Sequence, residues 1–331
     1  MKRSMICIAI SLLATTVMAQ PSVSLSGDLK VAGAYGNGGG TPIDGVAADH
    51  WRVNDFSSYI GISGKQDLPH GLHAGFELDA FASVDSGDTW SDSGGSGPFF
   101  SRRAVVTLDG DFGRVYVGRA FTPSQIMVLF ADPWYWDGSA AQVGWKVQQA
   151  NYTSTQGLRT DNTVGYISPK MSGLTVSLAA APGEQTHSRD LGASVTYDSG
   201  PIWLGVAYDQ SHGVADDPTL NHTVALVAGV DFQFVRPLLS YTSSRVGGVN
   251  YSAYSIAATA PLGENGLGKA EFAHLSDFDT VAAGKQGYVK YAVGYQYNFT
   301  KAFNLFGELA SAKGSGVSAT NTVEAGVEYG F

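Results

Sequence analysis

The amino-acid sequence predicts an all-β protein, a 16-stranded antiparallel transmembrane β-barrel. Three observations support this prediction: polar and apolar residues alternate with a period of two, short and long connections alternate between these segments, and charged residues are scarce. Only 15% of the 331 residues are charged and 42 are Gly, whereas soluble domains usually carry about 25% charged residues.

The composition excludes several other classes of protein. The 16 Tyr, 16 Phe and 6 Trp supply too much apolar surface for a disordered chain. Outside the N-terminus, no run reaches the about 18 apolar residues that a transmembrane helix needs. The formal net charge of −9 argues against binding to nucleic acid, which favours basic surfaces.

The N-terminus has the pattern of a cleavable signal peptide. Two basic residues at positions 2 and 3 precede a short apolar run that ends in Val17-Met18-Ala19, a sequence that signal peptidase accepts. We therefore expect residues 1–19 to be removed and residues 20–331 to form one barrel domain. The apolar run is too short for the alternative, a transmembrane anchor. Cys7 is the only cysteine and leaves with the signal, so the mature chain has no disulfide and no thiol ligand.

Segments with a period of two follow one another along the chain. A strand points successive side chains to opposite faces, so each such segment has one apolar and one polar face. In chain order, the clearest examples are Val23–Val31, Leu174–Leu178, Val224–Phe234, Val289–Phe299 and Val323–Phe331. The segments at 104–108 and 202–208 alternate poorly, and the pattern defines their faces badly.

Half-apolar antiparallel strands can build a soluble sandwich or a membrane barrel. A sandwich buries its apolar face and exposes richly charged residues. A membrane barrel turns its apolar face to lipid and lines its interior with small polar residues. Here the polar face is mostly small and uncharged, and aromatic residues such as Tyr297 and Tyr329 gather near strand ends. This distribution is typical of a lipid–water interface, so it favours the membrane barrel.

Short turns and longer connections alternate along the whole chain. Turns marked by Gly, Pro and Asp are predicted at 67–71, 109–111, 169–173, 198–201, 235–237, 261–266 and 300–301. Longer polar or Gly-rich connections are predicted at 36–50, 84–98, 120–157, 183–188, 210–221, 245–249, 278–286 and 313–320. Seven turns and eight loops join sixteen strands and place both termini on the side of the short turns. A barrel of this size encloses a water-filled lumen.

Several motifs, in this order and spacing, resemble one protein family. They are Gly61–Leu68, Arg102–Leu108, Gly110–Arg119, Asn162–Pro169 and the terminal Phe331. Together they resemble the Gram-negative general porins, the trimeric 16-stranded type of neisserial and Burkholderia-like bacteria. The resemblance implies an outer-membrane channel for passive diffusion of small hydrophilic solutes and ions, with no enzymatic step. It also implies a homotrimer, contact with outer-membrane lipids and lipopolysaccharide, and a terminal Phe331 that the outer-membrane assembly machinery reads.

The longest connection, at 120–157, is the third of the long set. In the resembled family this loop folds into the lumen and narrows it, and a connection of 38 residues is unusual in a compact domain. It carries Asp132 and Asp137 beside the aromatic run 134–136. We expect the aromatic side chains to pack against the inner wall and the two carboxylates to lie in the water path. The alternative is a loop that covers the mouth of the barrel from outside.

Opposite this loop, the resemblance implies a basic wall. Arg102 and Arg159 match two positions of the family's inward arginine cluster, and Arg114 is a third candidate because its parity is inward. The alternative for each arginine is a place on the surface or at the mouth. Arg103 and Arg119 have the parity of the apolar face, but they lie at strand ends, where the direction of a side chain is loosely defined.

Five further residues are predicted to line the lumen: Asp28, Lys30, Tyr59, Glu77 and Asp79. Asp28 and Tyr59 stand where the family usually has basic residues. Opposed charges at a constriction bias which ions enter without any chemical step. The predicted lining has three arginines but more acidic residues, and the mature chain has a net charge of −11. This balance predicts a slight preference for cations. Tyr59 also raises an alternative, a channel that prefers a sugar or an organic acid.

Enzymatic and purely structural functions have less support in the sequence. The seven His form no HExxH pair, no GxSxG motif is present, and we expect no metal and no cofactor. A barrel hydrolase remains an alternative because such enzymes assemble their catalytic residues without short motifs. A barrel adhesin is another, and it would need no wide lumen.

Overall fold

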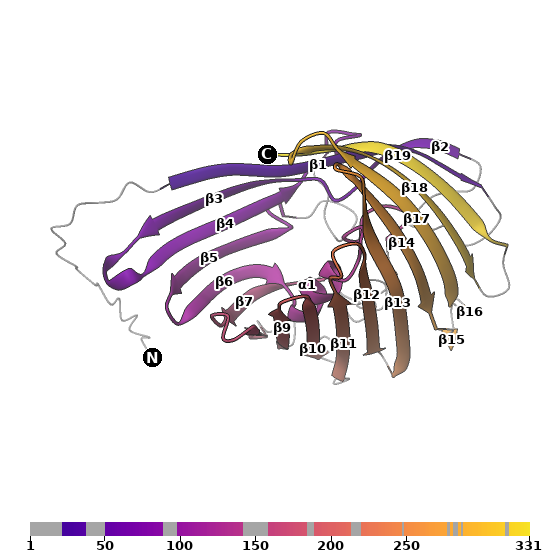
Figure 1. Cartoon of the computed structure of the whole chain (residues 1–331). Helices are drawn as coiled ribbons and strands as arrows, with labels where there is room; N and C mark the ends of the chain where they lie inside the picture. The colour runs from indigo at the N-terminus through magenta and orange to yellow at the C-terminus, as the bar shows by residue number, and fades with distance from the viewer. Residues whose placement is uncertain are drawn as a thin grey trace.

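The strands of the protein form one closed antiparallel barrel in the computed structural model (Figure 1). The structure describes residues 22–37, 50–88, 98–141, 158–183, 189–212, 220–246, 248–276, 279–280, 284–285, 287–314 and 318–331. The expected signal peptide at 1–19 lies outside the described residues.

Each barrel strand pairs with its neighbours in the sequence. The strands are β1 (Ser22–Asn37), β2 (His50–Asp55), β3 (Tyr59–Asp67), β4 (His73–Phe81), β5 (Arg103–Gly110), β6 (Gly113–Phe121), β7 (Arg159–Ile167), β8 (Leu174–Ala181), β9 (Asp190–Ser199), β10 (Ile202–His212), β11 (Leu220–Val230), β12 (Arg236–Val246), β13 (Val249–Leu262), β14 (Gly266–Leu275), β17 (Tyr288–Asn298), β18 (Phe303–Gly314) and β19 (Thr320–Gly330). Pairing of β1 with β19 closes the sheet. The short strands β15 (Asp279–Thr280) and β16 (Gly284–Lys285) form a separate hairpin.

Strands β2 and β3 together fill one position of the barrel. β3 pairs with the first part of β1 and β2 with its second part, and residues 56–58 interrupt the strand between them. At this break the Oγ of Ser58 accepts a hydrogen bond from the backbone N of Lys30 at 2.8 Å and donates to the Lys30 carbonyl at 3.1 Å. The side chain thus supplies the acceptor that the interrupted strand does not give to the Lys30 N–H, while the Lys30 carbonyl also accepts from the backbone N of Phe56 at 3.2 Å. With β2 and β3 taken as one strand, the described barrel has sixteen strands, which confirms the predicted fold class.

Neighbouring strands are joined by seven short turns at one end of the barrel, as predicted. The turn between β11 and β12 lies at 231–235 and not at the predicted 235–237, because Arg236 and Pro237 already pair with β13. Pro69–Gly71 forms a single 3₁₀ turn between β3 and β4. Gly173 (φ 91°), Gly200 (φ 59°) and Gly263 (φ 79°) supply the left-handed conformation at three of the other turns. Among the described residues, no helix is long and apolar enough to cross a bilayer.

Large apolar side chains of the strands are mostly exposed on one face, and polar side chains are buried on the other. On β19, Val323 is 40% exposed, whereas Thr322 and Glu324 are 3% and 1% exposed. On β17, Tyr291 is 60% exposed beside the buried Lys290. A soluble sandwich would show the opposite distribution. The apolar faces therefore point outward to lipid, and the polar faces point into the barrel.

Part of the third long connection lies against the inner wall. It contains α1 (Pro123–Phe130), which contacts β9, β10 and β11 and lies beside them in Figure 1. Met127 packs with alanines of β10 and β11, and Trp134 packs with alanines of β17 and β18. Residues 123–141 therefore reach from one side of the barrel interior to the other. Residues 142–157 of the predicted loop lie outside the described residues.

Candidate functional site

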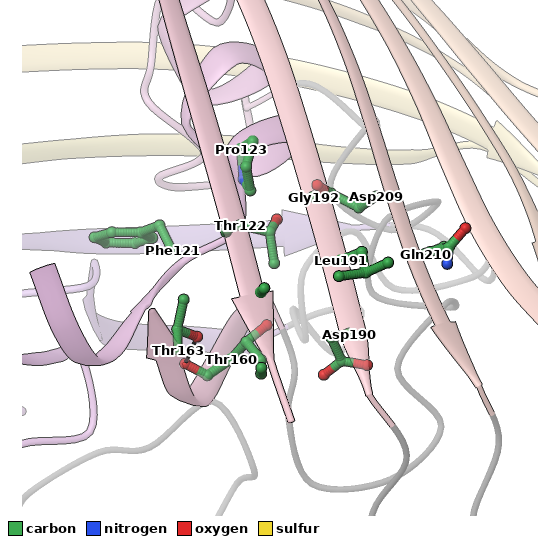
Figure 2. Close-up of a pocket in the computed structure, with 13 residues that line it drawn as sticks. Phe121, Thr122, Pro123, Thr160, Thr163, Asp190, Leu191, Gly192, Asp209 and Gln210 are labelled. Atoms are coloured by element: carbon green, nitrogen blue, oxygen red, sulfur yellow. Dashed lines mark hydrogen bonds between the residues drawn. The ribbon is translucent and has the colours of Figure 1, made fainter. Parts of the chain in front are cut away.

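The helix α1 is attached to the barrel wall at its first turn. Thr122 caps the helix by accepting a hydrogen bond from the backbone N of Gln125 at 3.3 Å. Asp209, inward on β10, accepts hydrogen bonds from the backbone N of Ser124 at 3.1 Å and from the Ser124 hydroxyl. Figure 2 shows Pro123 and Thr122 beside Gly192 and Asp209 on the neighbouring strands. A Cβ on Gly192 would lie 2.7 Å from the Pro123 ring, so a glycine is needed where the loop approaches the wall.

The turn that follows α1 is held by a buried carboxylate. Asp132 is 1% exposed, and its two oxygens accept hydrogen bonds from the backbone N of Trp134 and the backbone N of Trp136, both at 2.9 Å. We expected Asp132 to lie in the water path. This expectation was wrong, because the carboxylate is buried inside its own turn, where it accepts hydrogen bonds from the backbone. The residues it holds include Tyr135 (φ 54°) and Trp136 (φ 65°), two bulky side chains in the left-handed region.

The described end of the loop contacts the opposite wall. The backbone N of Ser139 donates to Glu324 on β19 at 3.0 Å, and Lys290 on β17 donates to the carbonyl of Ala141. Asp137 lies 3.8 Å from the Nζ of Lys30 on β1. Burial raises the pKa of Asp137 to about 7, although the nearby Lys30 acts to lower it. The ionised and the neutral form of this carboxyl are therefore both populated near neutral pH.

Acidic and basic side chains alternate along the inner wall of β4, β5 and β6. Arg102 and Arg103 both contact Oδ2 of Asp79, at 3.3 and 2.9 Å. Arg103 and Arg114 both contact Glu77, at 2.6 and 2.8 Å. Beyond them, the Nε of Arg114 lies 2.6 Å from Asp109. These ion pairs hold the arginine side chains in an ordered row.

Arg103 lies in this row, although its parity in the sequence matches the apolar face. On β5 the inward residues are the odd ones, and Arg103 shares their face with the buried Val105 and Thr107. The sequence misassigned the face because β5 carries valines at both parities, at 105 and 106. Arg119 instead bonds Asp161 at 2.7 Å beside an irregularity in the β6–β7 register.

Two arginines of the wall stack on aromatic rings. The guanidinium of Arg102 lies 3.8 Å from the centroid of Tyr59. The guanidinium of Arg159 lies 4.3 Å from the centroid of Phe121 and 5.0 Å from that of Phe81. Such stacking fixes the guanidinium plane and leaves its edge to donate hydrogen bonds.

The stacked arginines line one open cavity of about 700 Å³ inside the barrel. Six of the predicted site residues meet there: Asp28, Lys30, Tyr59, Arg102, Asp137 and Arg159. Arg103, Lys269 and Glu328 also line this cavity, although the sequence analysis did not single them out. For Lys269 and Glu328, inward parity on β14 and β19 was the available signal.

The other predicted site residues lie elsewhere in the barrel. Arg114 and Glu77 line a separate cavity nearer the short turns, with Asp109 and Thr107. Asp79 is 4% exposed and reaches the larger cavity through its ion pairs with Arg102 and Arg103. Arg114 was predicted beside Arg102 and Arg159, but it stands one residue from the β5–β6 turn, so it does not share their cavity.

The C-terminal residue completes the closing seam of the barrel. The backbone N and carbonyl of Phe331 exchange hydrogen bonds of 3.0 Å with Gly27 on β1. Its ring is 44% exposed and stacks on Tyr329 with centroids 6.0 Å apart. Phe331 therefore ends an outward aromatic pair at the edge of the membrane-facing surface.

A closed barrel of this size, with an apolar exterior and charged residues around an interior cavity, defines an outer-membrane channel protein. A family model described as Gram-negative porin matches residues 7–317. The chain belongs to this family of Gram-negative porins.

Relatives of known name agree with this assignment over the full length of the chain. Outer membrane porin protein 32 of Delftia acidovorans is 29% identical, over all of this chain and 95% of the relative. Major outer membrane protein P.IB of Neisseria meningitidis serogroup B is 26% identical over all of both chains. The solved structure of the anion-selective porin from Comamonas acidovorans has a TM-score of 0.79 and 25% identity, covering 94% of this chain and all of that one. The protein is therefore an outer-membrane porin of a Gram-negative bacterium, a channel and not an enzyme.

Proposed function

We propose that the cavity lined by Arg102, Arg159 and Asp137 is the constriction of the channel, formed where the loop at 120–157 folds into the lumen. The observation that carries this proposal is the contact of residues 123–141 with both sides of the inner wall. A loop attached at both sides narrows the path of every solute. Charged residues at the narrowest place then act on ions most strongly, because low-dielectric walls focus their field.

The local charges favour anions, in contrast to the lean toward cations expected from the whole sequence. The basic residues that line the cavity are Lys30, Arg102, Arg103, Arg159 and Lys269. The acidic residues that line it are Asp28, Asp137 and Glu328. The cavity is thus basic although the chain as a whole is acidic. Charges at the constriction influence ion entry more than distant ones, which solvent and salt screen. The similar solved structure from Comamonas acidovorans is named an anion-selective porin, which supports the same preference for anions.

Several parts of the proposal concern assembly. We infer a homotrimer embedded among outer-membrane lipids and lipopolysaccharide. We also infer that Phe331, at the end of an alternating strand, is read by the outer-membrane assembly machinery, and that residues 1–19 direct export. The exposed apolar side chains of the barrel strands support contact with lipid.

Planar bilayers test the constriction. The purified protein should insert with conductance in three steps, and its reversal potential in a salt gradient should show a weak preference for chloride over potassium. Removing two guanidinium groups by Arg102→Ala with Arg159→Ala should shift the reversal potential toward cations. Arg114→Ala removes one guanidinium group, half the charge of the double variant, from a neighbouring cavity, so twice its shift is the control for an effect of net charge alone. If the double variant shifts neither conductance nor reversal potential more than this control, the two arginines do not line the constriction.

A further inference from the structure

Three large apolar side chains of the loop are exposed inside the water-filled barrel. Ile126, Phe130 and Tyr135 are 37%, 51% and 55% exposed, and all three line the cavity that contains Arg102 and Arg159. The rings of Phe130 and Tyr135 meet edge to face with centroids 6.2 Å apart. We call these three residues the apolar patch. A lumen that passed only strongly hydrated solutes would gain nothing from such a surface, and contiguous exposed apolar groups commonly mark binding sites.

The backbone holds this patch in place at an energetic cost. Tyr135 and the next residue, Trp136, are both in the left-handed region, where bulky side chains are disfavoured. The buried Asp132 fixes them by accepting the backbone N–H groups of Trp134 and Trp136. Backbone strain of this kind persists only where neighbouring groups enforce it, and it concentrates at ligand sites. The constrained turn keeps the Tyr135 ring in the cavity, while Trp134, 2% exposed, packs against the wall.

The same cavity presents hydrogen-bond donors for an anion. A guanidinium has five N–H donors, and among the described residues the side chain of Arg102 uses one, in its bond to Asp79 at 3.3 Å. Because its face lies on Tyr59 at 3.8 Å, its remaining donors point along the plane of the group. A carboxylate binds such an edge through two parallel hydrogen bonds.

We propose that this cavity contains a subsite for small aromatic carboxylates, with the carboxylate at Arg102 and the planar ring against Phe130 and Tyr135. This inference rests on the proposed function and adds a class of solute to it. The amphiphilic solute matches the cavity because a simple anion would use only the basic wall and a neutral aromatic compound only the apolar patch. Binding has to be weak, since a channel must release what it attracts.

Benzoate is the probe, and cyclohexanecarboxylate is its control because it has a similar size and the same charge but no planar π-system. Acetate and benzyl alcohol isolate the carboxylate and the ring. In planar bilayers of the wild-type protein, millimolar benzoate should reduce the chloride current more strongly than any of the three. Equal inhibition by benzoate and cyclohexanecarboxylate would overturn the role of the aromatic rings in the apolar patch. Equal inhibition by benzoate and benzyl alcohol would overturn the role of Arg102.

Variants locate the subsite within the lumen. Phe130→Ala and Tyr135→Leu should each weaken inhibition by benzoate by about 3- to 10-fold, the range expected for the loss of one aromatic contact. Arg102→Gln should weaken it at least as much, whereas Arg114→Gln, in the neighbouring cavity, should not. Insertion into the bilayer as open channels shows that each variant is folded, and the inhibition by benzoate is compared with each variant's own chloride current. A further outcome is that the wild type shows the proposed conductance and ion preference while benzoate inhibits these variants as strongly as the wild type. In that case the proposed subsite is wrong and the proposed constriction stands.

Discussion

The carboxylate of Asp209 on β10 accepts hydrogen bonds from both the backbone N–H and the hydroxyl of Ser124, the second residue of α1. Asp209 is 3% exposed, and this pair attaches the start of the helix to the barrel wall. The wall itself is built from backbone pairing of β9, β10 and β11, to which the Asp209 side chain adds nothing. Loop position and barrel stability are therefore separable at this contact.

Asp209→Ala should release α1 without unfolding the barrel. Hydrogen bonds to a charged group contribute about 1.5–3 kcal/mol each, enough to increase the population of a detached helix. We expect single-channel current with more frequent fluctuations, while the barrel's urea midpoint stays close to that of the wild type. Asp198→Ala is the control, because Asp198 pairs with Lys170 at the exposed turn end, 2.9 Å away. A quiet current in Asp209→Ala would show that the apolar contacts of Met127 and its neighbours hold the helix alone.

Gly138→Ala should weaken the attachment at the other end of the loop. Gly138 has φ 76°, and a Cβ there would lie 2.9 Å from Oε2 of Glu324 and closer still to Oε1 of Glu308. The left-handed conformation alone costs about 1–2 kcal/mol for an alanine, and the clash adds to it. We expect larger fluctuations of the current and faster proteolysis within residues 120–157.

The control for this substitution is Gly200→Ala. Gly200 has φ 59°, but a Cβ there would meet nothing within 4 Å. Gly200→Ala carries the same kind of strain in a turn far from the loop, so its current should match that of the wild type. If both variants behave alike, the carboxylates of Glu308 and Glu324 do not confine the loop.

The barrel was predictable because its physical cause repeats in every strand. Alternation with a period of two and turn residues between segments are local features. They were sufficient to predict sixteen strands and seven turns. The break between β2 and β3 was not predictable, since it depends on a contact of Ser58 with Lys30, 28 positions away in the sequence. Closure by β1 and β19 follows from the predicted barrel class and not from any residue of these two strands.

The site was less predictable because it depends on small differences in side-chain direction. Arg102 and Arg159 were found through resemblance, and both line the cavity. Arg103 was missed because the apolar residues of β5 do not alternate. For Asp132, the sequence places a carboxylate in the loop but cannot distinguish one that faces water from one that caps its own turn. Residues such as Asp209, which contact the loop from distant strands, have no local signal at all.

The ion preference should depend on pH through Asp137. Its pKa is raised to about 7 by burial, so the folded loop retains a proton that the unfolded chain releases near its usual pKa of 3.8. Burying the ionised form is unfavourable, so the docked loop loses stability as the pH rises from about 4 through 7. The groups that face Asp137 are Lys30, Asp28 and Glu328 from β1 and β19 and Ser57 from the strand break.

Below pH 7 the constriction loses one negative charge, so the preference for chloride should be stronger at pH 5.5 than at pH 8.5. The measurement is the reversal potential in a potassium chloride gradient at both pH values. Asp137→Asn mimics the protonated form, so it should show a stronger chloride preference than the wild type at pH 8.5 and a smaller shift between the two pH values. A wild-type reversal potential that is the same at pH 5.5 and 8.5, or an Asp137→Asn variant that retains the full shift, would contradict this assignment.

Ser58→Ala should destabilise the barrel itself. Ser58 is 1% exposed, and its Oγ forms hydrogen bonds with both the backbone N and the carbonyl of Lys30 at the interruption between β2 and β3. Alanine leaves the buried N–H of Lys30 without this acceptor, which costs about 1–3 kcal/mol. The Lys30 carbonyl keeps its hydrogen bond from the backbone N of Phe56 at 3.2 Å. We expect a lower urea midpoint, measured by the fluorescence of the barrel's tryptophans. Ser22→Ala removes an exposed hydroxyl that donates to the Lys65 carbonyl at 3.4 Å, and it should leave the midpoint unchanged. Equal midpoints for the two variants would mean that backbone rearrangement or water replaces the Ser58 hydroxyl.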